Sequence, residues 1–312
     1  MTVCLLLLSV VALTAAVPVP RLLTRAAWPE REPVVGLWVW QCLVATLLLC
    51  CLTALALGAA AVFETVRTQL FAPAPPAVTA AYSLSAAPPW TVALVLLLAS
   101  GAAWTTAMLA RELAEARRCR AQARARLRER APELPAGLPP ARGPVLVLED
   151  EYPDAWWMPG SRPQLVVTTG ALHRLTDHQL DAVLTHERGH ARARHDWLLH
   201  LSSALATGFP RVPLFAHFCD QTHRLVELAA DDTASRRCGH LTTALALIEL
   251  NQHRGVLSCA SSNRLLGERV DRLLAPPPRL HRRHRALTTA LAALVPLVPL
   301  LITFAPGLTA LS

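Results

Sequence analysis

The chain has 312 residues, of which 53% are hydrophobic and only 17% are charged, and its mean hydropathy is +0.35. This apolarity excludes a wholly soluble protein and indicates several membrane spans with one modest soluble domain. The formal net charge is +8, and the eight cysteines show no paired metal-ligand spacing, so we expect no disulfide framework.

Three apolar stretches in the first third of the chain are predicted membrane helices. Residues 3–19 form the first; a cleaved signal peptide is the alternative, but no arginine precedes the stretch and its cleavage-site match is weak. Residues 34–63 form the second, with Trp38 and Trp40 as interfacial anchors near its start. Residues 90–109 form the third.

Residues 111–130 are the most charged part of the chain, with eight arginines against three glutamates. We predict a solvated basic helix that extends out of the membrane and that, beside the bilayer, would lie on the anionic inner leaflet. Direct nucleic-acid binding is not expected, because aromatic interleaving and a recognised motif are both missing. The excess of arginine places this segment in the cytoplasm. A proline-rich linker follows it.

The soluble part begins with two predicted strands, residues 145–148 and 164–169, separated by a turn-rich connection. An edge strand could pair with an extended peptide by strand addition, and we assign this role to residues 164–169 as a hypothesis. The alternative is that they belong to a small core sheet. Residues 197–209 are apolar but too short to cross a bilayer, so we expect a helix packed on the domain or dipped into the membrane surface.

A helix is predicted to follow the second strand. Thr176 and Gln179 form a capping-box pattern, and apolar residues at helical spacing come next. Since no proline occurs before Pro210, we expect this helix to run from about Asp177 through the central motif of the chain. Gly189 lies inside it and costs about 1 kcal/mol relative to alanine, which indicates a packing or access requirement.

The central motif is H-E-R-G-H, an H-E-x-x-H pattern. On a helix His186 and His190 lie on one face, so both imidazoles can reach one metal ion. Glu187 projects beside them toward a metal-bound water, as in hydrolytic zinc sites. The alternative is a solvated helix face with chance histidines. His195 and His200 do not fall on the ligand face and are expected at the surface.

A site of this type needs a third protein ligand. Glu227 lies on a second predicted helix, residues 216–251, and Asp231 is four residues further along the same face. Asp231 could hydrogen-bond a ligand histidine. Cys219 and His223 share that face and remain alternative ligands, and a solvated acidic stripe is the other interpretation.

An amphipathic helix is predicted over residues 263–274. Its Arg269 has two interpretations. One is a surface arginine paired with Glu268 or Asp271, which we favour slightly. The other is a position near the cleft of a peptidase, by similarity to related enzymes.

Together these motifs resemble the BlaR/MecR-type integral membrane zinc metallopeptidases of bacteria, a gluzincin family, over about residues 144–274. The resemblance rests on H-E-R-G-H, on Arg194-His195-Asp196, on E-L-A-A-D-D from Glu227 onward, and on the strand-then-helix entry that precedes them. The more distant HtpX-type membrane proteases share the first pattern and a later E-x-x-x-D.

The resemblance implies one zinc ion per chain, with His186, His190 and Glu227 as ligands. It makes Glu187 the catalytic base and Asp231 a residue that supports a ligand histidine. The chain lacks the penicillin-binding sensor domain of the antibiotic-sensing members, so direct beta-lactam sensing is not expected.

The expected fold is mainly α, with four transmembrane helices and a cytoplasmic α+β zincin-like metallopeptidase domain between the third and the fourth. We divide the chain into three membrane helices with short loops (1–110), a basic helix with a proline-rich linker (111–143), the zinc metallopeptidase domain (144–285) and a fourth membrane helix kinked by prolines (286–312). Four spans of the cell membrane place both termini outside.

The expected function is zinc-dependent endoproteolysis of a cytoplasmic or juxtamembrane protein, in regulated proteolysis or signal transduction. In the resembled family cleavage relieves repression by a small DNA-binding repressor, so such a repressor is a candidate partner besides the lipid bilayer. Two alternatives stay open: a non-proteolytic membrane signal transducer with a structural zinc site, and a quality-control protease for membrane proteins.

Overall fold

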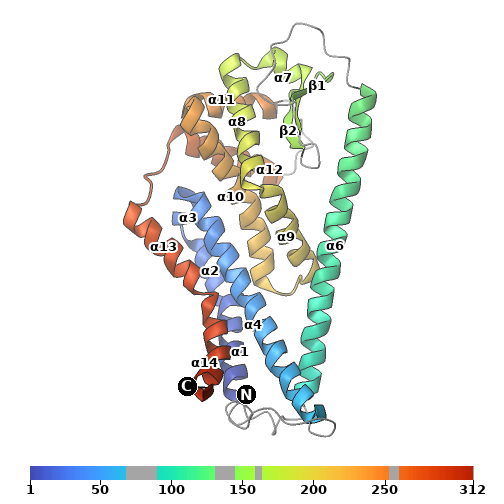
Figure 1. Ribbon diagram of the computed structural model, residues 1–312. Coiled ribbons are helices and arrows are strands. Elements are labelled where there is room, and N and C mark those ends of the chain that lie inside the picture. Colours follow the sequence, from blue (N-terminus) through green and yellow to red (C-terminus); the bar gives the residue numbers. More distant parts are fainter. Residues whose placement is uncertain (68–89, 131–144, 159–163, 253–259, 312) are drawn as a thin grey trace.

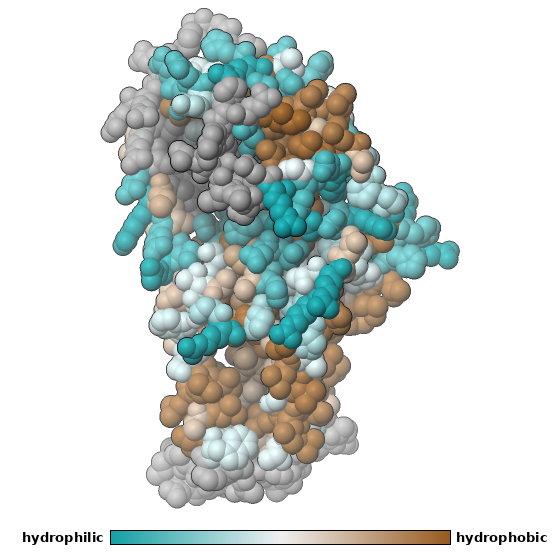
Figure 2. Space-filling model, turned by 180° about the vertical axis from the view of Figure 1, so that it is seen from behind, coloured by the Kyte–Doolittle hydropathy of each residue, from teal (hydrophilic) through white to brown (hydrophobic). Residues whose placement is uncertain are grey.

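The computed structural model describes residues 1–67, 90–130, 145–158, 164–252 and 260–311. The described chain is mainly helical, with one small sheet. Long helices form the lower part, where both termini lie, and the sheet lies at the opposite end (Figure 1). Hydrophobic surface gathers around the lower helices, while hydrophilic residues dominate the middle of the molecule (Figure 2). The predicted proline-rich linker lies outside the described residues.

Three helical segments of the described chain are long and apolar enough to cross a membrane. They are α1 (Thr2–Ala16) with α2 (Pro18–Arg25), α4 (Pro33–Arg67) and α6 (Trp90–Arg130). The pair α13 (Arg282–Leu294) and α14 (Leu297–Leu311), bent by 46°, makes a fourth if it is counted as one span. The bend falls at Pro296, as expected for a residue that cannot donate a helical hydrogen bond. Length and composition therefore support several membrane spans.

Helix α6 is one uninterrupted helix of 41 residues. The predicted third span and the predicted basic helix are therefore continuous. None of the candidate membrane window of α6 is buried within the protein, whereas 50% of the window of α4 is buried. Helix α9 (His195–Gly208) packs against α6, where the indole nitrogen of Trp104 donates to the Gly208 carbonyl at 2.9 Å.

The main core joins α4 to the helices of the soluble part. Helix α10 (Pro213–Cys238) packs against α4 on one side and against α9 on the other. Trp40 is fully buried at this contact, so it is a core residue and not the expected interfacial anchor. The larger buried side chains of this core are Leu37, Trp40, Leu43, Val44, Leu47, Leu205, Leu214, Phe215, Phe218, Leu225, Val226 and Leu228. The apolar helix α4 thus shares one hydrophobic core with α9 and α10.

The sheet has three short strands, β1 (Val145–Leu148), β2 (Ala155–Met158) and β3 (Gln164–Thr168), in the order β1-β3-β2. β3 is the middle strand, parallel to β1 and antiparallel to β2. The hypothesis that residues 164–169 take up an extended peptide is therefore wrong, because both sides of β3 are already paired. The core-sheet alternative is correct. The edge strands are β1 and β2, and β2 forms within the predicted turn-rich connection.

Helix α8 (Asp177–Ala193) carries the central motif and packs beside β2. The predicted capping box is present, because the Thr176 side chain accepts from the Gln179 amide and the Gln179 side chain accepts from the Thr176 amide. The helix ends at Arg194, whose φ of 51° is left-handed, and α9 starts directly after it. The expected helix from Asp177 through the central motif is therefore present, and α9, which covers most of the apolar residues 197–209, is a separate helix and not a continuation of it.

The second predicted helix is broken into two. Helix α10 ends before Gly239, whose φ of 88° suits a glycine, and α11 (His240–Gln252) follows. Helix α12 (Ala260–Leu274) agrees with the predicted amphipathic helix and packs its apolar face on α11. Two short helices complete the described chain, α3 (Trp28–Arg31) between α2 and α4, and α7 (Thr169–Arg174) after β3.

Candidate metal centre

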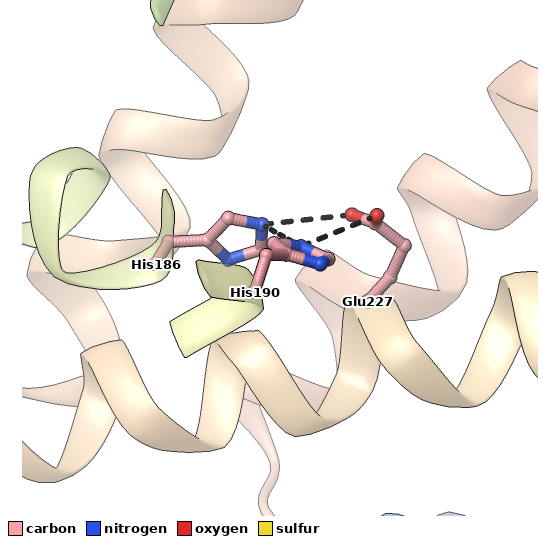
Figure 3. A group of neighbouring side chains, drawn as sticks. All are labelled: His186, His190 and Glu227. Atoms are coloured by element: carbon pink, nitrogen blue, oxygen red, sulfur yellow. Dashed lines mark hydrogen bonds and ion pairs between the residues drawn. The ribbon is translucent and has the colours of Figure 1, made fainter. Parts of the chain in front are cut away.

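Two imidazoles and a carboxylate converge between α8 and α10 (Figure 3). His186 and His190 lie one helical turn apart on α8, and their Nε2 atoms are 3.1 Å from each other. Glu227 of α10 faces both rings, with Oε1 3.5 Å from His190 Nε2 and Oε2 3.6 Å from His186 Nε2. The H-E-x-x-H spacing and a second helix packed alongside therefore bring three donor groups together.

These separations fit one zinc ion. Zinc binds imidazole nitrogen and carboxylate oxygen at about 2.0–2.2 Å with tetrahedral angles, which puts neighbouring donor atoms about 3.3 Å apart. The three observed separations lie close to that value. Among the described residues, His186, His190 and Glu227 form the group that could hold a metal ion. Three protein donors leave a fourth position for water, as in catalytic rather than structural zinc sites.

Gly189 explains how closely α8 and α10 approach. It is buried, and a Cβ atom at this position would lie 3.4 Å from Thr233 Cβ and 3.5 Å from Ala230 Cα. The predicted packing requirement is therefore a helix contact beside the metal centre. A methyl group would just fit there, whereas a larger side chain would push α10 and Glu227 away.

Each candidate ligand histidine is held at its Nδ1 atom, on the side of the ring away from the metal position. His186 Nδ1 lies 3.0 Å from Asp231 Oδ1, and His190 Nδ1 lies 2.9 Å from His195 Nδ1. His190 can offer Nε2 to a metal only in the tautomer whose Nδ1–H donates to His195. His195 is 5% exposed, so the expectation that it lies at the surface is wrong.

Arg269 of α12 balances the two carboxylates of α10. Its Nε and Nη2 atoms donate to Asp231 at 2.8 and 2.7 Å, and its Nη1 atom lies 2.7 Å from Glu227 Oε2. The Arg269 side chain is only 11% exposed. The favoured interpretation, a surface arginine paired with Glu268 or Asp271, is wrong. The planar guanidinium fork fixes both carboxylates at once, which a lysine could not do.

Glu187 lies beside the metal-ligand group and lines a cavity of about 380 Å³. Its Oε2 atom accepts a hydrogen bond of 2.9 Å from the backbone N–H of Trp157 on β2. Burial raises the pKa of Glu187. The edge strand thus holds an acidic group in place over the cavity, next to the position left open for water.

Residues 120–221 match the model of Peptidase family M48. The match supports the M48 metallopeptidase family for this part of the chain. The M48-matching segment contains the H-E-R-G-H motif but ends before Glu227. Glu227 is therefore identified as the third donor by its position in the structure and not by the family match. The match to Peptidase family M48 confirms neither the BlaR/MecR-type nor the HtpX-type subtype. No solved structure matches the chain.

Burial and neighbouring charges set the protonation of the site. Burial opposes ionisation of Glu227 and Asp231, but His186 and Arg269 hold both pKa values below their usual range. Burial, assisted by His186, lowers the pKa of His190 to about 4. Burial also disfavours a charged His186, but its hydrogen bonds to Asp231 and Glu227 raise its pKa to about 9. In the metal-free protein at neutral pH, Glu227 is therefore ionised, His190 is neutral, and His186 carries a proton that a bound metal ion would displace.

The two alternative ligands on α10 lie apart from this group. Cys219 Sγ is 3.7 Å from His223 Nδ1, and the same nitrogen is 2.9 Å from the Cys219 carbonyl. Neither residue belongs to the metal-binding group found among the described residues. Cys219 and His223 share a face of α10 as predicted, but their side chains contact each other and not the metal-ligand group.

Proposed function

We propose that this protein is an integral membrane zinc endopeptidase. The observation that carries the proposal is the convergence of His186, His190 and Glu227 on one point, with Glu187 held beside them over a cavity. The match of residues 120–221 to Peptidase family M48 and the apolar helices support it. We assign one zinc ion per chain to these three ligands.

A zinc ion bound there would lower the pKa of a bound water to about 7 and polarise a peptide carbonyl. Glu187 then acts as the base: it takes the proton of the attacking water and delivers it to the leaving nitrogen. The Trp157 amide orients the Glu187 carboxylate through its hydrogen bond. Asp231 and His195 keep the two imidazoles turned toward the ligand position.

The geometry favours an extended polypeptide as substrate. The edge strand β2 lines the cavity through Ala155, Trp156 and Trp157, together with Asp154 just before the strand. We therefore transfer the strand-addition hypothesis from residues 164–169 to β2. Part of the cavity lining is apolar and comes from Ala246, Leu247 and Leu250 of α11, which suits an apolar substrate side chain next to the cleaved bond.

We further propose that the peptidase part lies in the cytoplasm, close to the inner leaflet, with both termini outside. The excess of arginine in residues 111–130 supports this side of the membrane. The substrate is then a cytoplasmic or juxtamembrane protein. The resemblance to the BlaR/MecR-type family favours regulated cleavage that relieves a DNA-binding repressor.

Two observations weigh against a purely structural zinc site in a signal transducer. Such sites are usually closed by four protein ligands, whereas three of the described residues converge here. A structural site also needs no buried carboxylate beside it, and Glu187 is held there by a backbone hydrogen bond. A quality-control protease differs from a regulatory one in its substrates, so cleavage of many membrane proteins would favour it over cleavage of one repressor.

Substitution Glu187→Gln tests the proposal. We expect the variant to keep its zinc and to lose cleavage by about 10²- to 10⁴-fold, because the side chain keeps its shape but cannot take a proton. Metal analysis of the purified protein and proteomic comparison of cells with wild type or variant measure the two effects. Glu249→Gln on α11 is the matched control and should leave both unchanged. Undiminished cleavage by Glu187→Gln would show that another group is the base.

A further inference from the structure

The short helix α3 connects the apolar helices to the metal centre. It lies between α2 and α4 and packs against α4 and α10. The packing is close at Gly36 of α4, where a Cβ atom would lie 3.0 Å from Pro29 Cβ and 3.1 Å from Leu225 Cδ1. Helix α3 therefore lies packed between α4 and α10, in the stretch of chain that joins the first two apolar helices.

Two arginines tie α3 to α12. Arg224 of α10 donates through Nη2 to Glu30 Oε1 at 2.8 Å and through Nε to Glu268 Oε2 at 3.0 Å. Arg272 of α12 donates through Nε to the Glu30 carbonyl at 2.9 Å and pairs through Nη1 with Asp232 at 2.8 Å. Glu30 is thus held by its side chain and by its backbone, and α12 is held at both Glu268 and Arg272.

The same helix α12 positions the carboxylates of the metal centre. Arg269 lies between Glu268 and Arg272 in sequence, within one turn of each. It contacts Glu227 and Asp231 at 2.7–2.8 Å. A short helix moves as one body, so a shift at Glu268 and Arg272 also shifts Arg269.

We propose that Arg224 and Arg272, which link Glu30 of α3 to α12, are positioning residues for the metal centre. Glu30 holds Arg224 and Arg272, these hold α12, and α12 sets where Arg269 fixes Glu227 and Asp231. The arrangement of the first two apolar helices thereby controls how well the ligand set is organised. This inference rests on the proposed function in that zinc is the metal, but it does not require that the protein cleaves peptides.

Electrostatics and positioning predict opposite effects at Arg224. Replacing Arg224 by glutamine removes a positive charge one turn from Glu227, and this alone would tighten zinc binding. Loss of the contact between α3 and α12 loosens Arg269 and weakens zinc binding. Residues that support a metal ligand from behind typically change affinity by about 10- to 100-fold, and an indirect contact should give about three- to tenfold.

The experiment measures zinc affinity of the full chain in detergent micelles, by competition with a chromogenic chelator. We expect Arg224→Gln and Arg272→Lys to weaken zinc binding about three- to tenfold. Arg272→Lys keeps the charge but loses the fork that reaches Glu30 and Asp232 together. Arg264→Gln is the matched control, because Arg264 lies on α12, is exposed, and contacts Glu268 without touching α3. It should change the affinity less than about twofold.

A double-variant cycle with Arg269→Met identifies the route. If α12 acts through Arg269, the substitutions Arg224→Gln and Arg272→Lys have no further effect once Arg269 is absent. Equal losses with and without Arg269, or tighter zinc binding by Arg224→Gln, overturn the proposal. Thermal unfolding of each variant separates a loss of folding from a loss of positioning, and a folded Arg272→Lys with unchanged affinity also overturns it. A wild-type protein that binds zinc but cleaves nothing refutes the proposed function and leaves this test intact.

Discussion

The metal centre has two halves that are built differently. The α8 half, His186, Glu187 and His190, lies within five consecutive residues and within the segment that matches Peptidase family M48. The α10–α12 half, Glu227, Asp231 and Arg269, spans more than forty residues beyond that segment and is a buried charge network. A helical spacing is sufficient to form the first half. The second half exists only because α10 and α12 pack together, so its stability and its metal affinity are linked.

Loss of Arg269 should have the largest effect of the substitutions that test this comparison, because it destabilises the α10–α12 half and leaves the α8 half intact. Arg269→Met leaves Glu227 and Asp231 without their positive partner, and breaking a buried ion pair in this way costs about 3–5 kcal/mol. We expect a loss of that size in the free energy of unfolding of the metal-free protein. The control Arg237→Met removes the more exposed pair with Asp181 and should cost less than about 1 kcal/mol. Equal costs for the two variants would contradict a buried network.

Substitution Glu227→Gln tests whether the two halves share one metal ion. An amide keeps the volume but is a poor zinc ligand, so we expect zinc affinity to fall by more than about 100-fold, beyond the range for residues that only support a ligand. Chelator competition measures it, with Glu249→Gln as control. If Glu227→Gln binds zinc like the wild type, Glu227 is not a ligand.

His195→Ala sharpens the comparison within the α8 half. The variant removes the acceptor behind His190, and we expect about tenfold weaker zinc binding with the fold unchanged. His195→Gln keeps an acceptor and should recover part of the loss. His178→Ala, at an exposed position of α8, is the matched control. An equal effect of His178→Ala and His195→Ala would refute the orienting role.

Gly189→Ala should have the smallest effect and the opposite sign. The added methyl group meets Thr233 and Ala230 at ordinary contact distances, and alanine is the better helix former by about 1 kcal/mol. We expect the free energy of unfolding to rise by about 0.5–1 kcal/mol, measured by chemical denaturation. Gly189→Val should instead be destabilising, because it pushes α10 away. A destabilising Gly189→Ala would mean that α8 and α10 lie closer than the structure has them.

Sequence alone predicted what local spacing determines. The capping box, the pair of histidines and the acidic pair on α10 follow from helical periodicity. His195 was missed because it lies five residues after His190, which on an unbroken helix is the far face. The left-handed conformation of Arg194 turns α9 and brings His195 back. Neither glycine nor proline marks that break.

Other misses depended on tertiary contacts. Trp40 has the composition of an interfacial anchor, and only the packing of α10 on α4 makes it a core residue. Strand β2 has four residues and becomes a strand because β3 pairs with it. Arg269 had a local acidic neighbour that suggested a surface pair, and the stronger partners come from α10, far away in the sequence.

The continuous helix α6 has a mechanical consequence. Its 41 residues extend for about 60 Å, which is twice the thickness of the hydrocarbon core of a bilayer. If a straight helix of that length tilts by about 10° about one end, its other end is displaced sideways by about 10 Å. Bilayer thickness changes the tilt of spanning helices. In a bilayer that α6 spans, a change of tilt would shift α9, where Trp104 donates to the Gly208 carbonyl, and through α9 also α10.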